Sequence, residues 1–309
     1  MSTGKSSSNP SSGDLWPALS CQAFEPTRYL LHMALQAVGK LKLAEPFQAQ
    51  WAGVPLWLGA RGLTTGPIPY AGGAYEVRAD FVSHELQWLT SSGGSGQLPL
   101  GPTSVATLVE TFLGQLGRAG INASITLMPQ EVSNPIPFDE DKQLRPYDRD
   151  MVNAWWRILL STQRVLRVFQ GRFTGKTQPI GLMWGTFDIR VPFYNGKPAS
   201  PAPNVGYVRR NAMNAELVEV GWWSGDPSYP RPAFYSFTYP QPPGIEQAKI
   251  GPSAARWDAG MGEFLLDYDD LRQSGNPDGD LLAFLESAYV AGATAAGWDS
   301  ALLGGGRPG

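Results

Sequence analysis

The strongest restriction on the fold comes from short runs in which apolar and polar residues alternate. The runs AYEVRADFV (74–82) and ELQWLT (85–90) follow one another with only a Ser-His step between them, as in a β-hairpin. Successive side chains of a strand point to opposite faces, so such runs predict sheets with one packed face. Further strand-like runs occupy residues 54–63, 123–129, 180–193, 215–223, 233–240 and 263–268.

Other segments place apolar residues at helical spacing. These segments are residues 27–39, 103–117, 150–171 and 279–296. A sequence with 42% hydrophobic residues can bury a large core around such elements. We therefore predict an α+β fold of antiparallel sheets with flanking helices.

The chain also shows signs of an internal duplication. A shift of 127 residues places Trp57 on Trp184 and Arg61 opposite Asp188, and both halves run from a helix through strands to a helix. We predict two pseudo-repeated α+β halves, 15–143 and 144–300, around a central cleft; a common α+β architecture without duplication is the alternative. Residues 1–14 and 301–309 are rich in Ser, Gly and Pro and are expected to be disordered tails.

The stretch MWGTFDIRVPF (183–193) carries the most suggestive chemistry. If it forms one strand, its odd-numbered residues build a packing face, and Trp184, Asp188 and Arg190 share the other face. That polar face is either ordinary wet surface or the wall of a cleft. In the two-halves interpretation, Arg61 and Asp188 face the same cleft.

Two residues are therefore candidates for catalysis. Asp188 could act as a general base whose pKa is adjusted by the indole of Trp184 and by partial exclusion of water. Its alternative role is a surface carboxylate paired with Arg190 or Arg61. Arg61 could bind a carboxylate, phosphate or sulfate through its planar guanidinium, or form a buried structural ion pair.

Candidate substrate-binding residues surround this pair. They are Trp57, Trp184, Arg190, His32, Tyr235 and Tyr239. A histidine in an apolar helix such as LLHMAL is more often a hydrogen-bonded core residue than a catalyst, and aromatic residues in a strand more often pack than line a pocket.

Charge and motifs exclude several classes of function. The net charge of -3 gives no basic field for nucleic acid, and no apolar run reaches the roughly 20 residues of a membrane helix, so a cytoplasmic protein is expected. One cysteine and two histidines make a metal centre improbable, although Asp139, Glu140 and Asp141 form an acidic cluster. No nucleotide-binding glycine loop is present, and we expect no cofactor.

Several longer motifs resemble an uncharacterised bacterial family of unknown function. They include ARGLTT and PIPY (60–70), IPFDED (136–141), WGTFDI (184–189) and PAFYSFTYPQPPG (232–244). Where relatives tend to carry histidines, this chain has Gln48–Trp51, Pro179–Leu182 and Asn214–Glu216, so a histidine-based chemistry cannot be carried over to it.

Within that family the chain looks most like the aziridine-forming enzyme of azinomycin-type biosynthesis. That resemblance implies ring closure by an amine that displaces sulfate from a neighbouring carbon, on a substrate held by an acidic amino-group carrier protein. Asp188 would take the ammonium proton, Arg61 would bind the sulfate, and Arg157, Arg164 and Arg167 would dock the carrier. A non-catalytic ligand-binding module and a carboxylate- or metal-dependent hydrolase or lyase are the alternatives.

Overall fold

The computed structural model describes residues 15–303. Its six α-helices are α2 (Cys21–Lys40), α3 (Val105–Arg118), α4 (Arg149–Gln170), α5 (Tyr207–Ala212), α6 (Tyr268–Arg272) and α7 (Pro277–Ala295). Its strands are β1 (Leu56–Leu58), β2 (Gly62–Thr64), β3 (Ile68–Tyr70), β4 (Gly73–Asp80), β5 (Glu85–Thr90), β6 (Ser95–Pro99), β7 (Lys176–Thr177), β8 (Gly181–Met183), β9 (Asp188–Pro198), β10 (Ala215–Trp223), β11 (Ala233–Tyr239), β12 (Arg256–Asp258) and β13 (Glu263–Asp267). The short 3₁₀ helices are η1 (Leu41–Ala44), η2 (Ala49–Trp51), η3 (Ile245–Gln247) and η4 (Ser300–Leu302).

All thirteen strands belong to one antiparallel sheet, which confirms the predicted α+β class. The main order is β12-β13-β11-β10-β9-β8-β1-β2-β4-β5-β6, with β3 paired to β4 and β7 to β9. Strands from the two parts of the chain meet where β1 pairs with β8, through Leu56↔Leu182 and Trp57↔Gly181. The sheet is therefore continuous from the first part of the chain to the second.

The long helices begin at residues suited to that position. Ser20 caps α2 by accepting a hydrogen bond from the Ala23 N–H, and Asp148 caps α4 by accepting one from Met151. Pro277 stands in the first turn of α7, where a missing N–H costs nothing.

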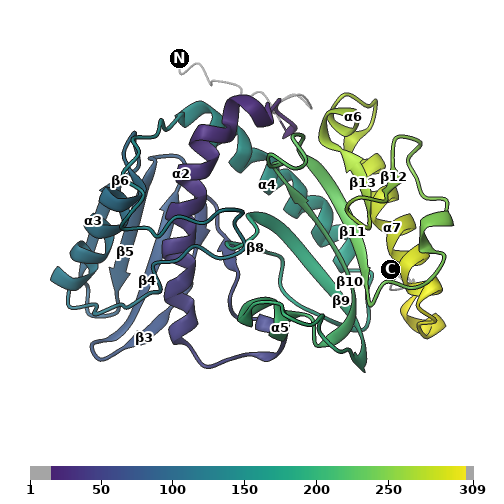
Figure 1. Cartoon of the computed structure of the whole chain (residues 1–309), viewed down its shortest axis with the longest axis horizontal. Coiled ribbons are helices and arrows are strands. Elements are labelled where there is room, and N and C mark those ends of the chain that lie inside the picture. The colour runs from purple at the N-terminus through teal and green to yellow at the C-terminus, as the bar shows by residue number, and fades with distance from the viewer. Residues whose placement is uncertain (1–14, 304–309) are drawn as a thin grey trace, which may run out of the picture.

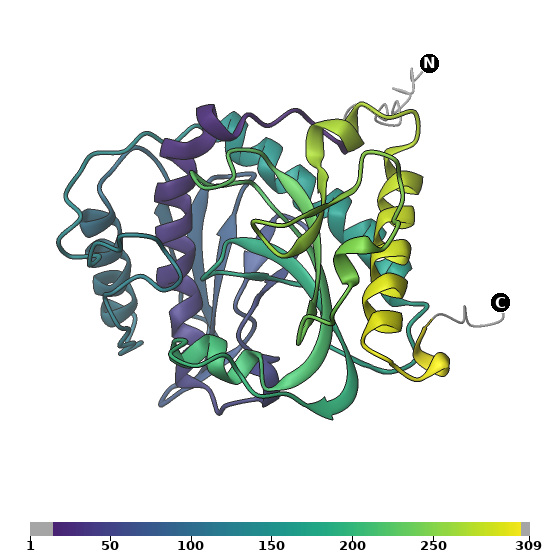
Figure 2. The ribbon, with the colours of Figure 1, turned by 45° about the vertical axis from the view of Figure 1, so that its right-hand side comes forward.

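The helices divide the sheet between them. Figure 1 shows α2 and α3 beside strands β3–β6, and α4 and α7 beside the later strands. In Figure 2 the green strands of the second part lie between the purple helix α2 and the yellow helix α7. Phe169 on α4 packs edge-to-face against Phe193 on β9, with ring centroids 5.1 Å apart. One face of β9–β11 is thus covered by α4 and α7.

Three predicted strands differ from the structure. Residues 54–63 contain the whole of β1 and the start of β2, with a bend between them. Residues 123–129 form no strand, and their carbonyls instead accept hydrogen bonds from Lys40. The stretch 183–193 is a hairpin: β8 ends at Met183, residues 184–187 turn, and β9 begins at Asp188, paired with Met183.

The turn explains why the stretch is not one strand. Phe187 has φ +63, and its N–H donates to the Met183 carbonyl at 2.8 Å. Trp184 and Asp188 therefore do not share a strand face, contrary to the prediction from alternation.

The ends of the chain need one correction. Residues 300–302 form η4, and the Tyr289 hydroxyl donates to the Leu302 carbonyl, so the part of the predicted C-terminal tail at 301–303 is ordered. The predicted tail at 1–14 and the remainder at 304–309 lie outside the described residues. The division into duplicated halves stays a prediction. Between residues 15 and 303, no helix is long and apolar enough to cross a membrane.

Candidate functional site

A cavity of about 550 Å³ opens on the face of β9–β11 that α4 and α7 leave uncovered. Because Phe193 on β9 points toward α4, the alternate residues Asp188, Arg190 and Tyr194 point the other way, and all three line the cavity. Helix α5, the 3₁₀ helix η2 and the loop after α3 supply one part of the rim through Arg209, Gln50 and Glu131, and the start of β13 supplies Glu263.

Strand register builds the floor of this pocket. Gly221 on β10 is opposite Arg190 on β9 and opposite Tyr235 on β11. A Cβ atom at Gly221 would lie 2.5 Å from the Tyr235 hydroxyl and 2.3 Å from the Ile189 carbonyl oxygen. The glycine therefore lets Tyr235 reach across β10 and donate a hydrogen bond to Asp188.

Asp188 has both carboxylate oxygens engaged. The Thr186 hydroxyl donates to one oxygen and the Tyr235 hydroxyl to the other. Burial raises the pKa of Asp188, and the two hydroxyl donors together with the charge of Arg190 act in the opposite direction. Burial and the Asp188 charge raise the pKa of Tyr235 as well, so its phenol remains a donor.

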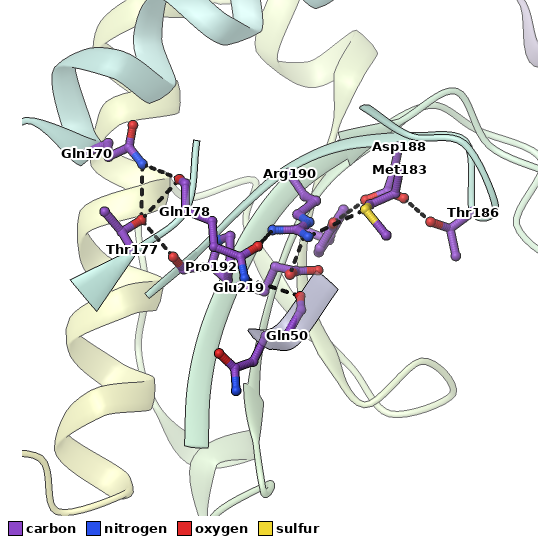
Figure 3. Close-up of polar contacts among 11 residues, drawn as sticks. Gln50, Gln170, Thr177, Gln178, Met183, Thr186, Asp188, Arg190, Pro192 and Glu219 are labelled. Carbon is purple, nitrogen blue, oxygen red and sulfur yellow. Dashed lines mark hydrogen bonds and ion pairs between the residues drawn. The ribbon is translucent and has the colours of Figure 1, made fainter. Parts of the chain in front are cut away.

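Arg190 is the buried cation of the pocket (Figure 3). Its guanidinium donates to Gln178 Oε1 at 2.6 Å and to the Met183 sulfur at 3.4 Å, and it lies 3.7 Å from a Glu219 carboxylate oxygen. Gln178 in turn donates to the Gln50 carbonyl at 3.2 Å. Arg190 is therefore held by neutral partners and by one carboxylate.

Acidic side chains outnumber basic ones in the lining. The carboxylates are Glu131, Asp188, Glu219, Asp226 and Glu263, and the guanidinium groups are Arg190 and Arg209. Asp226 is occupied in a turn, where it accepts hydrogen bonds from the Ser228 and Tyr229 N–H groups. We call the other four carboxylates the acid cluster.

The carboxyl groups of the acid cluster have pKa values above their ordinary range. Burial, together with the charges of Asp188 and Glu131, raises the pKa of Glu219 to about 7. Burial and the charges of Glu219 and Asp188 raise the pKa of Glu263 to about 8. Glu131 is an exposed residue at the rim; partial burial of its carboxyl and the charge of Asp188 raise its pKa, and Arg209 lowers it. Burial, together with mutual repulsion between the carboxylates, therefore favours a proton or a bound cation in the pocket.

Four of the predicted site residues line the pocket: Asp188, Arg190, Tyr235 and Tyr239. Tyr239 donates its hydroxyl to the Ser200 carbonyl at 2.6 Å, which ties β11 to the segment before α5.

Arg61 does not line this pocket, so the predicted pairing of Arg61 and Asp188 in one cleft is wrong. Arg61 lies in the bend between β1 and β2, and its Nε donates to Asp80 at 2.6 Å. Its side chain is 58% exposed. The Val82 and Ser83 N–H groups also donate to Asp80, so Arg61 completes a local turn.

The other predicted aromatic and histidine residues also lie outside the lining. Trp184 is buried, packs against Gly39 and donates its Nε1–H to the Val54 carbonyl at 3.0 Å. The Lys42 ammonium lies 4.6 Å from the ring centroid of Trp57. His32 is buried, and burial lowers its pKa to about 3, so it is a neutral donor to the Trp184 and Gly185 carbonyls.

The three arginines predicted to dock a carrier protein lie on α4, which covers the face of the sheet opposite the pocket, and none of them lines the cavity. Arg164 forms an ion pair with Asp278 on α7, Arg157 is half-buried with interactions of its own, and Arg167 is exposed. A carrier protein docked on α4 would face the side of the sheet opposite the pocket.

The acidic run in the loop before α4 does not gather ligands. Asp141 is buried and forms an ion pair with Arg145 at 2.9 Å, while Asp139 and Glu140 are exposed. Across residues 15–303, no group of three or more His, Cys, Asp or Glu side chains could hold a metal ion.

Glu131, Glu219, Glu263 and Arg209 were missed by the sequence analysis. Glu219 could have been recognised from the sequence, because it stands between Val218 and Val220 in the apolar run AELVEVGWW. A carboxylate flanked in this way must be exposed on a strand face or placed in a polar pocket. Glu131 and Arg209 lie outside any periodic pattern and gave no such signal.

The 3₁₀ helix η2 and the segment between α5 and β10 meet at the pocket rim. Gln50 donates its side-chain amide to Asn214 Oδ1 at 2.9 Å. Amides thus occupy the place where the segments come together.

The comparisons with known proteins give one result. No curated protein and no solved structure matched the chain. A family model described as a family of unknown function (DUF5996) matches residues 16–304, which is nearly the whole sequence. The chain therefore belongs to the DUF5996 family, whose members share this sequence pattern without an assigned activity.

Proposed function

We propose that the pocket binds a small molecule carrying a primary ammonium group and that Glu219 removes a proton from this group. The observation that carries the proposal is the acid cluster: four carboxylates share one cavity with raised pKa values. A bound ammonium would relieve their repulsion, and the aromatic lining from Trp223, Tyr235 and Phe237 suits a cation.

Glu219 fits the role of general base better than Asp188. A base is most effective when its pKa lies near the working pH, and the pKa of Glu219 is about 7. The oxygens of Asp188 already accept hydrogen bonds from Thr186 and Tyr235. Asp188 is assigned a supporting role: its charge raises the pKa of Glu219 and it orients Tyr235.

The reaction we propose is intramolecular ring closure to an aziridine. Glu219 accepts a proton from the substrate ammonium, and the nitrogen lone pair then forms a bond to the neighbouring carbon. The carbon–oxygen bond to sulfate breaks, and sulfate leaves with the bonding electrons. The ring forms as its protonated aziridinium ion, which releases its remaining proton to solvent to give the aziridine. Holding nitrogen, carbon and leaving oxygen in line supplies much of the rate enhancement.

Arg209 takes the place that the sequence analysis gave to Arg61. It is exposed on α5, lines the cavity, and lies close enough to Glu131 and Glu263 to lower the pKa of both carboxyls. We assign it the sulfate leaving group, whose charge its guanidinium would stabilise. A substrate tethered to an acidic carrier protein would enter beside α5, where Arg210 is also exposed.

The test uses 2-aminoethyl hydrogen sulfate, the simplest molecule with both reacting groups. Wild-type protein should release sulfate, which ion chromatography measures, and form aziridine, which proton NMR detects. Glu219→Gln should lose turnover, whereas Glu110→Gln, on the exposed side of α3, should keep it. Absence of both binding and turnover would refute the amine-site proposal.

The second candidate is a non-catalytic module that binds an amine in the same pocket. The aromatic side chains Trp223, Phe237 and Tyr239 in the lining favour it, because they suit ligand binding without chemistry. Saturable binding of 2-aminoethyl hydrogen sulfate without sulfate release would favour this role. Ethyl hydrogen sulfate, which lacks the amine, should bind much more weakly in either case.

A further inference from the structure

Three polar residues on one side of α2 are buried and spaced four residues apart: His32, Gln36 and Lys40. Residues at this spacing lie above one another on a helix face. All three direct their side chains to backbone carbonyls of other segments, and the Gln36 side-chain amide nitrogen also lies 3.2 Å from His32 Nε2. We call them the α2 ladder.

Two members of the α2 ladder bind the loop that carries Glu131. Lys40 donates to the Thr126 carbonyl at 2.6 Å and also to the Met128 carbonyl. Gln36, which is 0% exposed, makes a double contact with Gln130: its Oε1 accepts from the Gln130 N–H and its Nε2 donates to the Gln130 carbonyl, both at 2.8 Å. The backbone immediately before Glu131 is thus fixed.

The third member, His32, fixes the backbone segment against which the Glu131 carboxylate packs. His32 Nε2 donates to the carbonyls of Trp184 and Gly185, at 3.0 and 2.9 Å. A Cβ atom at Gly185 would lie 2.7 Å from Glu131 Oε2, so the carboxylate rests directly against this glycine. Glu131 itself has φ +54, a conformation that costs a non-glycine residue free energy and persists only where its surroundings enforce it.

We propose that Gln36 is a positioning residue of the pocket: through the Gln130 backbone it holds Glu131 in the acid cluster. Gln36 does not line the cavity, whereas Glu131 does, and the Glu131 charge helps to raise the pKa of Glu219. The inference rests on the proposed function only in treating Glu131 as part of the amine site. The placement of the carboxylate can be measured without any amine.

The test is a double-mutant cycle read by the titration midpoint of Glu219. Protein labelled with ¹³C at glutamate carboxyl groups is titrated by NMR, and Glu219→Gln identifies the Glu219 signal. Glu131→Gln should lower the Glu219 midpoint by about half a unit to one unit, the scale expected for a nearby charge of the same sign. Gln36→Met, which keeps the shape but neither donates nor accepts strongly, should lower it by a similar amount.

The cycle distinguishes positioning from general support. In the Gln36→Met background, Glu131→Gln should have no further effect, because Glu131 has already left the acid cluster. Val38→Ala, which trims a buried core residue of the same helix, should leave the Glu219 midpoint unchanged.

An unchanged Glu219 midpoint in Gln36→Met, or a full Glu131→Gln effect in that background, would overturn the inference. If Gln36→Met does not fold, Gln36→Leu, which is also uncharged and has neither the donor nor the acceptor, is judged by the same criteria. Binding of 2-aminoethyl hydrogen sulfate is measured separately, so that a positive cycle with no amine binding would refute the proposed function alone.

Discussion

Replacement of Glu219 by glutamine should stabilise the protein more at high pH than at low pH. Glu219 lies in the pocket with its side chain 18% exposed, and its pKa rises from 4.5 to about 7 on folding. The folded state therefore holds the proton more tightly than the unfolded state. Between these two pKa values the wild type loses stability as pH rises, because the unfolded state has released its proton and folding must take one up.

The size of the effect follows from the pKa change. A shift of one unit corresponds to roughly 1.36 kcal/mol, so this group costs up to about 3 kcal/mol well above pH 7. At pH 5 the cost is below about 1 kcal/mol, since Glu219 is then protonated in the folded state. Glutamine carries no charge at either pH and avoids the cost.

Urea unfolding at pH 5, 6, 7 and 8 measures this difference. The free energy of unfolding of Glu219→Gln minus that of wild type should grow by about 2 kcal/mol from pH 5 to pH 8. Any constant offset from altered packing is the same at each pH and does not affect the slope. Glu110→Gln on the exposed side of α3 serves as the control.

A difference that stays flat with pH, or that shrinks as pH rises, would show that Glu219 is not desolvated among like charges. Such a result would remove the electrostatic basis for an amine site.

Three further substitutions test the fold around the site. Gly221→Ala should destabilise the protein by about 2–4 kcal/mol, measured by urea unfolding, because the new methyl collides with the Tyr235 hydroxyl and a backbone carbonyl. Phe187→Ala should cost about 3–5 kcal/mol in the same assay, because Phe187 is buried and stacks on Trp155 with ring centroids 4.9 Å apart; a loss below about 1 kcal/mol would contradict this packing. Arg61→Ala should cost about 1 kcal/mol or less and leave the NMR midpoint of Glu219 unchanged, since the guanidinium is 58% exposed and Asp80 keeps its two backbone N–H donors; a shifted midpoint would show that Arg61 acts on the pocket.

Local patterns were enough to predict the four long helices and most strands, but not the short helices α5 and α6. The hairpin of β4 and β5 followed from alternation across a short step, and α4 followed from apolar residues at helical spacing. The turn at 184–187 was missed because apolar residues continue through it: Trp184 and Phe187 are buried from the turn itself. Alternation cannot reveal a turn whose side chains enter the core.

The pocket was harder to predict because it depends on strand register. Asp188 and Arg190 were found from one segment, but Glu219 reaches them only through the pairing of β9 with β10. Glu131 arrives from a loop 57 residues earlier than Asp188, and its position depends on contacts with α2. Neither relation is a property of a single stretch of sequence.

The seam between β1 and β8 has a consequence for dissecting the protein. Only Leu56↔Leu182 and Trp57↔Gly181 join the strands there, while Gln36 and Glu131 come from one side of the seam and Gly185 and Asp188 from the other. Separate expression of residues 15–143 and 144–300 would therefore divide the pocket's charges between two fragments. Reassembly of the two fragments could be measured by NMR as the return of glutamate carboxyl groups that titrate near neutral pH.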